Sequence, residues 1–232
     1  MATFRSVKIE IEPGRAVDGR VELPAAGGEG CRAFVLMAHG AGNDMHEALL
    51  TYLADGLASR GCGTLRFNFP YRCEGRGRPD SQRVLERTWR AAVEWARRRP
   101  DIETCNLLAG GKSMGARVAS QLGAAGQLAV GGFLFWGYPL HAPGKTHQLR
   151  DAHLDAIGAP MLFVAGTRDS FCNLDLMQPV VKRLGKRAAL EIIEAGDHSF
   201  RVPRNAGRSQ ESVYADILER SYRWIENLPA NG

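Results

Sequence analysis

The sequence predicts an α/β protein, a three-layer α/β/α sandwich around a mostly parallel sheet with an antiparallel hairpin at its N-terminal edge. Three observations lead to this fold class. Short runs of consecutive apolar residues alternate along the chain with longer segments of helical periodicity, as in strands joined by crossover helices. The apolar runs show no polar and apolar alternation, which indicates strands covered on both faces. Alternation is found instead near the N-terminus, where it indicates the edge hairpin.

The N-terminal hairpin comes first in the chain. Residues 7–11 alternate apolar and charged side chains, and residues 21–23 continue the pattern after a turn that contains glycine. The Gly/Ala-rich stretch 25–30 is expected to be a loop, since what precedes it is too short to be a domain. With no internal repeat or low-complexity tract, a single domain over residues 1–232 is expected.

The remaining elements follow in alternation. Helical spacing is clearest at Leu85, Trp89 and Ala92, which would face the sheet. In such a sandwich, ligands bind at the carboxyl ends of the strands. The expected strands are 33–38, 63–69, 106–109, 130–136, 160–165 and 189–193, and the expected helices are 47–59, 81–99, 114–122, 174–184 and 209–227.

The chain is basic, with a formal net charge of +5 and a pI near 9.1. Its densest positive run, residues 97–99, falls where a helix should end, and cations there suit the negative end of the helix dipole. A nucleic-acid or anionic surface is the alternative interpretation. No zinc-finger spacing or aromatic RNA-binding signature accompanies the run, so no nucleic-acid partner is expected.

The cysteines and the apolar segments bear on the compartment. The chain has five cysteines, an odd number without a C-x-x-C pair, which favours reduced thiols. The N-terminal residues lack the apolar core of a secretory signal, and no segment approaches the roughly 20 apolar residues that span a bilayer. A cytoplasmic protein without a membrane partner is expected, and its oligomeric state is left open.

The sharpest motif is Gly111-Lys112-Ser113-Met114-Gly115, which lies between an apolar strand and a helix. It matches G-x-S-x-G, a strand-to-helix turn so tight that the serine is strained and its neighbours must be small. The hydroxyl of Ser113 would then lie exposed at the strand tip, as a nucleophile.

A phosphate-binding loop is the competing interpretation of the same residues. The end of the motif also matches G-x-x-x-x-G-K-[ST], but Asn106 occupies the position of the first glycine. Residues 106–109 are moreover apolar and strand-like where a flexible anion-binding loop is needed. Nucleotide binding is therefore not expected.

Acyl transfer also needs donors for the developing oxyanion. The Met114 amide comes with the turn, and the second amide is expected from Ala41, or from Gly42 as substitute, in the loop after the strand 33–38. His39 is expected to be a structural hydrogen-bonding residue. The alternative is that this loop is only a strand-terminating turn.

The acid and the base are expected after later strands. Asp169 follows the strand 160–165, and His198 follows the last strand, which gives the order Ser, Asp, His. Asp169 would orient the imidazole of His198, the general base. Two alternatives are that Asp169 only caps the next turn, and that Asp197 is the acid, although it is poorly placed to reach back to its neighbour.

Taken together, the motifs HGAG, GGKSMG, GTRD and GDHSF resemble the α/β-hydrolase superfamily over nearly the full length, and RFNFPYR, GYPLHAPGK and GTRDSFC resemble small, lid-poor bacterial members related to dienelactone hydrolases. The resemblance implies the α/β-hydrolase fold. Dienelactone hydrolases use a cysteine where this chain has Ser113, so a different substrate is implied. A lid would lie between Trp136 and Pro160, where the chain is too short for a large one. An open cleft is expected, with Phe171 in its lining and Phe69 in the core. Tyr71 and Tyr138 are expected either to line this cleft or to pack in the core.

The expected activity is that of a serine hydrolase acting on an ester, thioester or lactone of a small molecule through an acyl-enzyme, without metal or cofactor. The alternatives are a serine peptidase for small peptides and a non-catalytic binding or scaffold protein that keeps this fold.

Overall fold

The computed structural model describes residues 3–24, 33–102 and 105–229. The loop predicted at 25–30 and Cys31 lie outside these residues. The strands are β1 (Thr3–Glu12), β2 (Arg15–Leu23), β3 (Ala33–Ala38), β4 (Gly63–Phe67), β5 (Asn106–Lys112), β6 (Gly132–Trp136), β7 (Met161–Gly166) and β8 (Ala188–Ile193), and the helices are α1 (Ala48–Ala58), α2 (Pro70–Cys73), α3 (Gln82–Arg97), α4 (Met114–Ala124), α5 (Leu174–Leu184) and α6 (Gln210–Glu226). Short 3₁₀ turns are η1 (Ala152–Ala156), η2 (Gly185–Arg187) and η3 (Arg204–Ala206).

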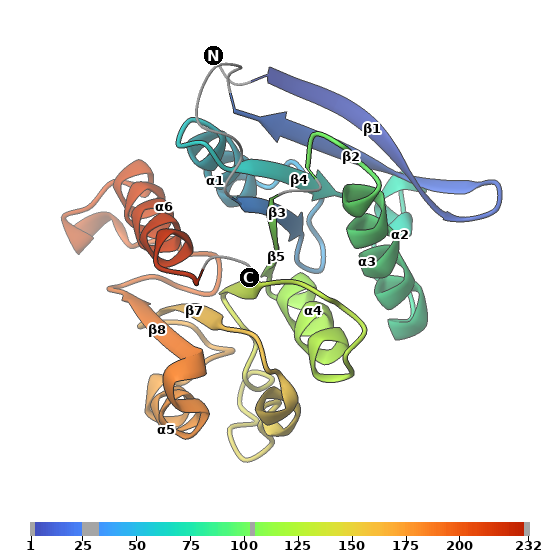
Figure 1. Ribbon diagram of the computed structural model, residues 1–232. Helices are drawn as coiled ribbons and strands as arrows, with labels where there is room; N and C mark the ends of the chain where they lie inside the picture. The colour runs from blue at the N-terminus through green and yellow to red at the C-terminus, as the bar shows by residue number, and fades with distance from the viewer. Residues whose placement is uncertain (1–2, 25–32, 103–104, 230–232) are drawn as a thin grey trace.

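The strands of the described residues form one eight-stranded sheet in the order β1-β2-β4-β3-β5-β6-β7-β8. The hairpin of β1 and β2 is antiparallel and lies at one edge, where β2 also pairs antiparallel with β4 (Figure 1). All other pairs are parallel. The predicted fold class is therefore confirmed. The carboxyl ends of β3, β5, β7 and β8 consequently meet at one edge of the sheet.

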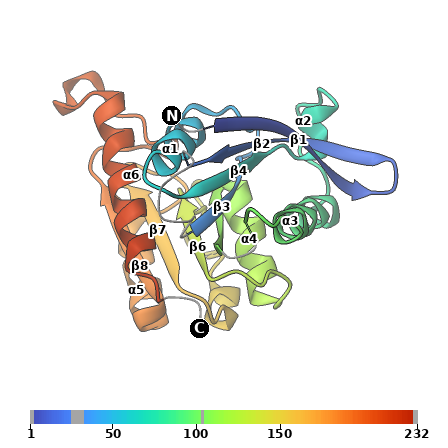
Figure 2. The same cartoon turned by 45° about the horizontal axis from the view of Figure 1, so that its top comes forward.

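Helices cover both faces of this sheet and give the sandwich its three layers. Apolar residues of α1 and α6 pack in one core cluster, and those of α3, α4 and α5 pack in another on the opposite face. Figure 2 shows α6 and α1 on one side of the strands and α3 and α4 on the other. The strands between them are almost wholly apolar because neither face meets water.

Several element boundaries differ from the expectation, most of all in the N-terminal hairpin, whose strands β1 and β2 are longer than the predicted runs at 7–11 and 21–23. The β5 strand continues three residues beyond 109, to Lys112, because its neighbours β3 and β6 supply partners on both sides. The β4 strand ends at Phe67 instead of 69, and Pro70 then begins the short helix α2. Proline suits a first helical position, since its missing N–H would have no partner there.

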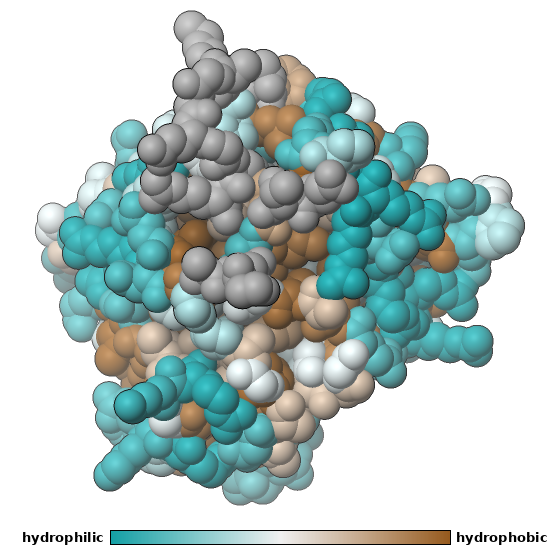
Figure 3. All heavy atoms as spheres, viewed as in Figure 1, coloured by the Kyte–Doolittle hydropathy of each residue, from teal (hydrophilic) through white to brown (hydrophobic). Residues whose placement is uncertain are grey.

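The basic run at residues 97–99 lies at the end of α3, as predicted. Arg98 pairs with Glu94 one turn earlier, and Arg99 pairs with Asp101. On the face seen in Figure 3, hydrophilic residues lie mainly around the periphery, and hydrophobic residues show between them toward the middle. Within the described ranges, no helix is both long and apolar enough to cross a bilayer.

A buried ion pair joins the hairpin to the parallel part of the sheet. Arg66, on β4, donates to Glu22, on β2, over 2.6 Å, and the two side chains are 1% and 3% exposed. Thr64 donates to the second oxygen of the same carboxylate. Neither charge reaches water, so removing one partner would leave the other uncompensated.

We therefore expect Glu22→Gln to lower the free energy of unfolding by about 3 kcal/mol, because Arg66 would keep a buried charge without a counter-ion. Urea denaturation measures the change. Glu94→Gln is the control, since it removes a carboxylate from the exposed pair with Arg98, and it should cost less than about 1 kcal/mol. An equal loss in both variants would contradict the prediction.

Candidate active site

Ser113 lies in the tight turn that joins β5 to α4. Its backbone has φ 50° and ψ −108°, a conformation that residues other than glycine rarely adopt. A Cβ at Gly111 would lie 2.5 Å from the carbonyl carbon of Gly115, and one at Gly115 would lie 2.5 Å from the Ala38 oxygen. Both glycines of G-x-S-x-G are thus required by close backbone approach, and the strain at the serine has a structural cause.

The same segment excludes a phosphate-binding loop. Residues 106–112 form a continuous strand that pairs with β3 and β6, so no flexible loop precedes Ser113. Backbone N–H groups that such a loop would direct at a phosphate are here used in the sheet.

A chain of hydrogen bonds links the three residues expected at the ends of β5, β7 and β8. The Oγ of Ser113 lies 2.8 Å from Nε2 of His198, and Nδ1 of His198 lies 2.9 Å from both carboxylate oxygens of Asp169. The Asp169 side chain is fully buried and the imidazole is 18% exposed. The structure thus brings together a hydroxyl, an imidazole and a carboxylate that lie far apart in the sequence.

The loops that carry Asp169 and His198 are bonded to each other. Arg168 donates its amide to the Gly196 carbonyl over 2.9 Å, and the Ala195 amide donates to the Thr167 hydroxyl over 2.8 Å. Gly166 and Gly196 approach each other so closely that a Cβ added at Gly166 would lie 2.5 Å from the carbonyl carbon of Gly196. These contacts fix the position of Asp169 relative to the imidazole of His198.

The neighbouring carboxylate, Asp197, has a different part in the structure. Its Oδ1 accepts the backbone amides of Ser199 and Arg201, each over 2.8 Å. It therefore shapes the loop around His198, while Asp169 makes the contact with the imidazole.

The loop after β3 brings Ala41 to the site. The buried His39 holds this loop: its Nδ1 bonds the Gly40 carbonyl over 2.8 Å, and its Nε2 accepts the Phe69 amide over 3.1 Å. Burial lowers the pKa of His39 to about 4, so the ring is neutral and can accept that bond. Met114 is the first residue of α4, where an amide has no carbonyl partner within the helix.

A cavity of about 220 Å³ lies beside Ser113. Ala41, Met114 and Phe171 line it, and the Phe171 ring lies 4.3 Å from the imidazole of His198 between ring centroids. Tyr71 and Tyr138 were expected either to line the pocket or to pack in the core, and they do not contribute to this cavity. They are 0% and 1% exposed, because they pack into the apolar core around α3 and α4. The remaining lining residues are Gln82, Arg117, Val118, Pro139 and Arg150.

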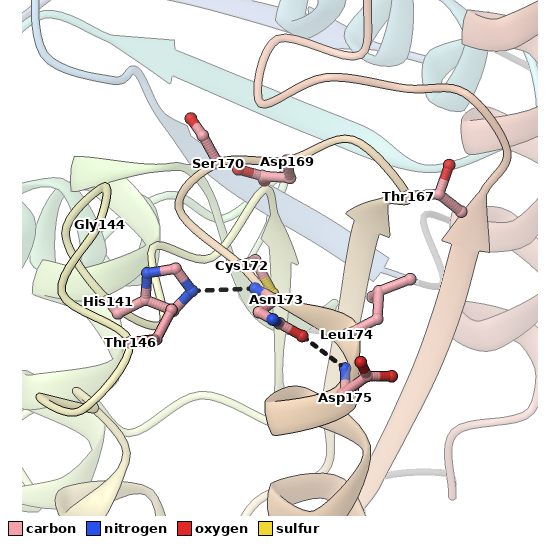
Figure 4. Close-up of a pocket in the computed structure, with 10 residues that line it drawn as sticks. All are labelled: His141, Gly144, Thr146, Thr167, Asp169, Ser170, Cys172, Asn173, Leu174 and Asp175. Carbon is pink, nitrogen blue, oxygen red and sulfur yellow. Dashed lines mark hydrogen bonds between the residues drawn. The ribbon is translucent and has the colours of Figure 1, made fainter.

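A second hollow, of about 630 Å³, borders Asp169 without including Ser113 or His198 in its lining. Figure 4 shows its side chains, which come from the loop after β6, the loop after β7 and the start of α5. There the His141 ring accepts the Asn173 amide, so it holds the loop at the start of α5. Within the described ranges, no group of three or more His, Cys, Asp or Glu residues is arranged to hold a metal ion.

Lys112 is a site residue that the sequence analysis did not single out. Its Nζ donates to the His198 carbonyl over 2.5 Å, and its side chain is almost wholly buried beneath the imidazole loop. Burial lowers the pKa of Lys112, while the charges of Glu47, Asp169 and Asp197 act in the opposite direction. The available signal was an ionisable residue at the end of an otherwise apolar strand.

We expect Lys112→Met to lower kcat by about 10²-fold, because a catalytic group displaced by about 1 Å loses that much rate. Assays should be run well below the melting temperature of the variant, so that unfolding does not contribute. Lys182→Met, on the exposed side of α5, is the control and should keep the wild-type rate. An unchanged kcat in folded Lys112→Met protein would show that the bond to His198 is dispensable.

Comparison with known proteins agrees with the fold. A family model described as an alpha/beta hydrolase domain matches residues 31–226. The dienelactone hydrolase of Anabaena variabilis is similar in structure, with a TM-score of 0.75, 19% identity and 98% of each chain covered. XC6422 of Xanthomonas campestris, described as a serine hydrolase without lid, gives a TM-score of 0.73 at 22% identity, over 99% of this chain and 97% of that chain.

Est1E of Butyrivibrio proteoclasticus gives a TM-score of 0.72 at 14% identity, over 96% of this chain and 99% of that chain. At these identities the likeness concerns the fold. The family model, however, spans most of the chain, from the start of β3 to the end of α6. The protein belongs to the alpha/beta hydrolase family.

Proposed function

We propose that this protein is a serine hydrolase that cleaves an ester, thioester or lactone of a small molecule through an acyl-enzyme. The observation that carries the proposal is the hydrogen-bonded chain from Ser113 through His198 to Asp169, with 2.8 Å and 2.9 Å between the bonded atoms. A nucleophile within hydrogen-bonding distance of a base, which is itself oriented by an acid, is the arrangement that acyl transfer requires.

In the first half of the reaction, Nε2 of His198 takes the proton of Ser113, and Oγ attacks the carbonyl carbon. Asp169 accepts the hydrogen bond from Nδ1 and stabilises the imidazolium that forms. The tetrahedral intermediate collapses when the bond to the leaving group breaks, and the leaving group takes the proton from Nε2.

In the second half, Nε2 of His198 takes a proton from water as its oxygen attacks the acyl carbon. The bond between that carbon and Oγ then breaks, Nε2 returns the proton to Oγ, and the acid is released. The amides of Met114 and Ala41 act as oxyanion donors in both halves. Both residues line the cavity beside Ser113, which supports this assignment, and Gly42 follows directly as the substitute donor. The reaction as proposed uses side chains, backbone amides and water.

The size of the cavity also favours a substrate with a small acyl group. Its volume of about 220 Å³ lies below the usual range for ligand pockets of drug-like molecules, roughly 300–1,000 Å³. Phe171 gives this cavity an apolar wall, and its ring lies against the imidazole of His198.

A fluorophosphonate probe tests the proposal directly, because it reacts with an activated serine. We expect wild-type protein to be labelled at Ser113, identified by mass spectrometry of the modified peptide, and Ser113→Ala to remain unlabelled. Ser199→Ala is the matched control, since it removes a serine hydroxyl next to His198 in the sequence, and it should be labelled at the wild-type rate.

Equal labelling of wild type and Ser113→Ala would contradict the assignment. Folded wild-type protein that is neither labelled nor active on p-nitrophenyl esters and acyl thioesters would favour a non-catalytic binding role for the fold.

A further inference from the structure

Two arginines line the cavity beside Ser113. Arg117 comes from the first turns of α4, and Arg150 comes from the segment between β6 and β7. Both side chains are half-buried. No aspartate or glutamate is among the residues that line this cavity, so its wall carries two positive charges and no negative one.

Neither guanidinium has a counter-ion among the residues that the structure describes. Nε of Arg117 is buried and makes no hydrogen bond. The carboxylates nearby are already engaged: Asp151 bonds Arg183 over 2.9 Å, and Asp169 bonds His198. A half-buried guanidinium without a counter-ion carries a desolvation cost that an anionic ligand would reduce.

The other polar neighbours of these arginines are neutral. Burial raises the pKa of Tyr138 to about 12, so its hydroxyl stays protonated and provides no counter-charge. Burial and the charge of Arg117 both lower the pKa of His153, which keeps that ring neutral. The pKa of Arg150 is lowered by burial and then by the charge of Arg117, which shows that the two cations act on each other.

The position of Arg117 directs its charge toward the nucleophile. Its amide donates to the Ser113 carbonyl over 3.0 Å, so it lies one helical turn beyond the serine. Side chains on a helix tilt toward the N-terminus, which here means toward Ser113. The positive end of the α4 dipole adds to the attraction for an anion at this place.

We propose that Arg117 and Arg150 bind a carboxylate of the substrate, so that the preferred substrates are short esters or thioesters with a negative group a few bonds from the scissile carbonyl. This inference rests on the proposed function, because it names the substrate class of the same site. A guanidinium presents a planar fork of donors that matches a carboxylate. One helical turn, about 5.4 Å, separates Ser113 from Arg117, which suits an acyl chain of a few carbons.

Two p-nitrophenyl esters of equal acyl length test the inference: the hemiester of glutaric acid, which carries a carboxylate, and the neutral valerate. We expect wild-type kcat/KM to be about 10²-fold higher for the hemiglutarate, since a hydrogen-bonded charge pair contributes roughly that factor. A second pair, 3-acetoxybenzoate and phenyl acetate, places the carboxylate on the leaving group. A preference within the first pair alone assigns the site to the acyl side.

The ratio of kcat/KM for the two acyl esters is the readout in the variants. We expect Arg117→Gln and Arg150→Gln each to lower this ratio by about tenfold or more, whereas a general loss of structure would lower both rates together. Arg98→Gln is the control, because it removes the same charge at a place away from the cavity. Arg98 follows the last residue of α3, whereas Gln82, which lines the cavity, is the first residue of that helix. It should leave the ratio unchanged.

A wild-type ratio near 1 in both substrate pairs would overturn the inference while leaving the hydrolase activity intact. So would a high ratio that neither arginine variant lowers. If no ester is turned over, titration calorimetry with Ser113→Ala still tests whether the two arginines bind a carboxylate. Glutarate should bind that protein more tightly than dimethyl glutarate, and the preference should vanish when Arg117→Gln is added. Equal binding of the two compounds would exclude the anion site.

Discussion

Ser113→Ala is expected to lower kcat for an activated ester by roughly 10⁵- to 10⁶-fold, because the covalent route through the acyl-enzyme is lost. His198→Ala should lower kcat by a similar factor, since the hydroxyl of Ser113 would have no base within 2.8 Å. Steady-state kinetics with a p-nitrophenyl ester measures both effects. The protein should stay folded, because alanine at φ 50° is no more strained than the native serine.

The double variant Ser113→Ala/His198→Ala tests whether the two residues act together. In the proposed mechanism Ser113 and His198 act as one unit, so removing both residues should cost about as much as removing either alone. Independent contributions would instead multiply the two losses. Residual activity far above the uncatalysed rate in Ser113→Ala, with an unchanged melting temperature, would contradict the assignment of the nucleophile.

The fold was predictable because the sandwich leaves its signature in local patterns. Strands covered on both faces must be apolar throughout, so the run at 33–38 has the same limits as β3. The end of β5 was not predictable in this way. Gly110, Gly111 and Lys112 have low strand propensity, and they are held extended because β3 and β6 pair with them on both sides.

The residues expected to act at Ser113 were predictable for a related reason. Parallel strands place their carboxyl ends at one edge of the sheet, so the order of the motifs along the chain already indicates which loops meet. Asp169 and His198 were found from this order, and the structure places them within hydrogen-bonding distance of each other.

The lining of the cavity did not follow from the motifs. Tyr71 and Tyr138 follow strand ends, yet their side chains turn into the core, where an aromatic ring buries more apolar surface. Arg117 and Arg150 were not singled out, since which side chains meet at the cavity depends on the path of a long loop and on the rotation of α4. The residues proposed to determine substrate preference are therefore ones that no local pattern marks.

Replacing Asp169 with asparagine tests whether Asp169, and not Asp197, is the acid that orients His198. We expect Asp169→Asn to lower kcat by about 10⁴-fold, less than the loss in Ser113→Ala, because the nucleophile, the base and the oxyanion donors remain. The amide would no longer stabilise the imidazolium or fix the tautomer in which Nδ1 carries the proton. Steady-state kinetics with the same ester measures the loss.

Asp197→Asn is the matched control, since it changes the adjacent carboxylate in the same way. An asparagine there keeps an oxygen that can accept the amides of Ser199 and Arg201, so the loop should hold its shape. We expect at most about a tenfold fall in kcat, because Asp197 makes no contact in the hydrogen-bonded chain from Ser113 to Asp169. A larger loss in Asp197→Asn than in Asp169→Asn would reverse the assignment of the acid, and equal losses would mean that neither carboxylate alone orients His198.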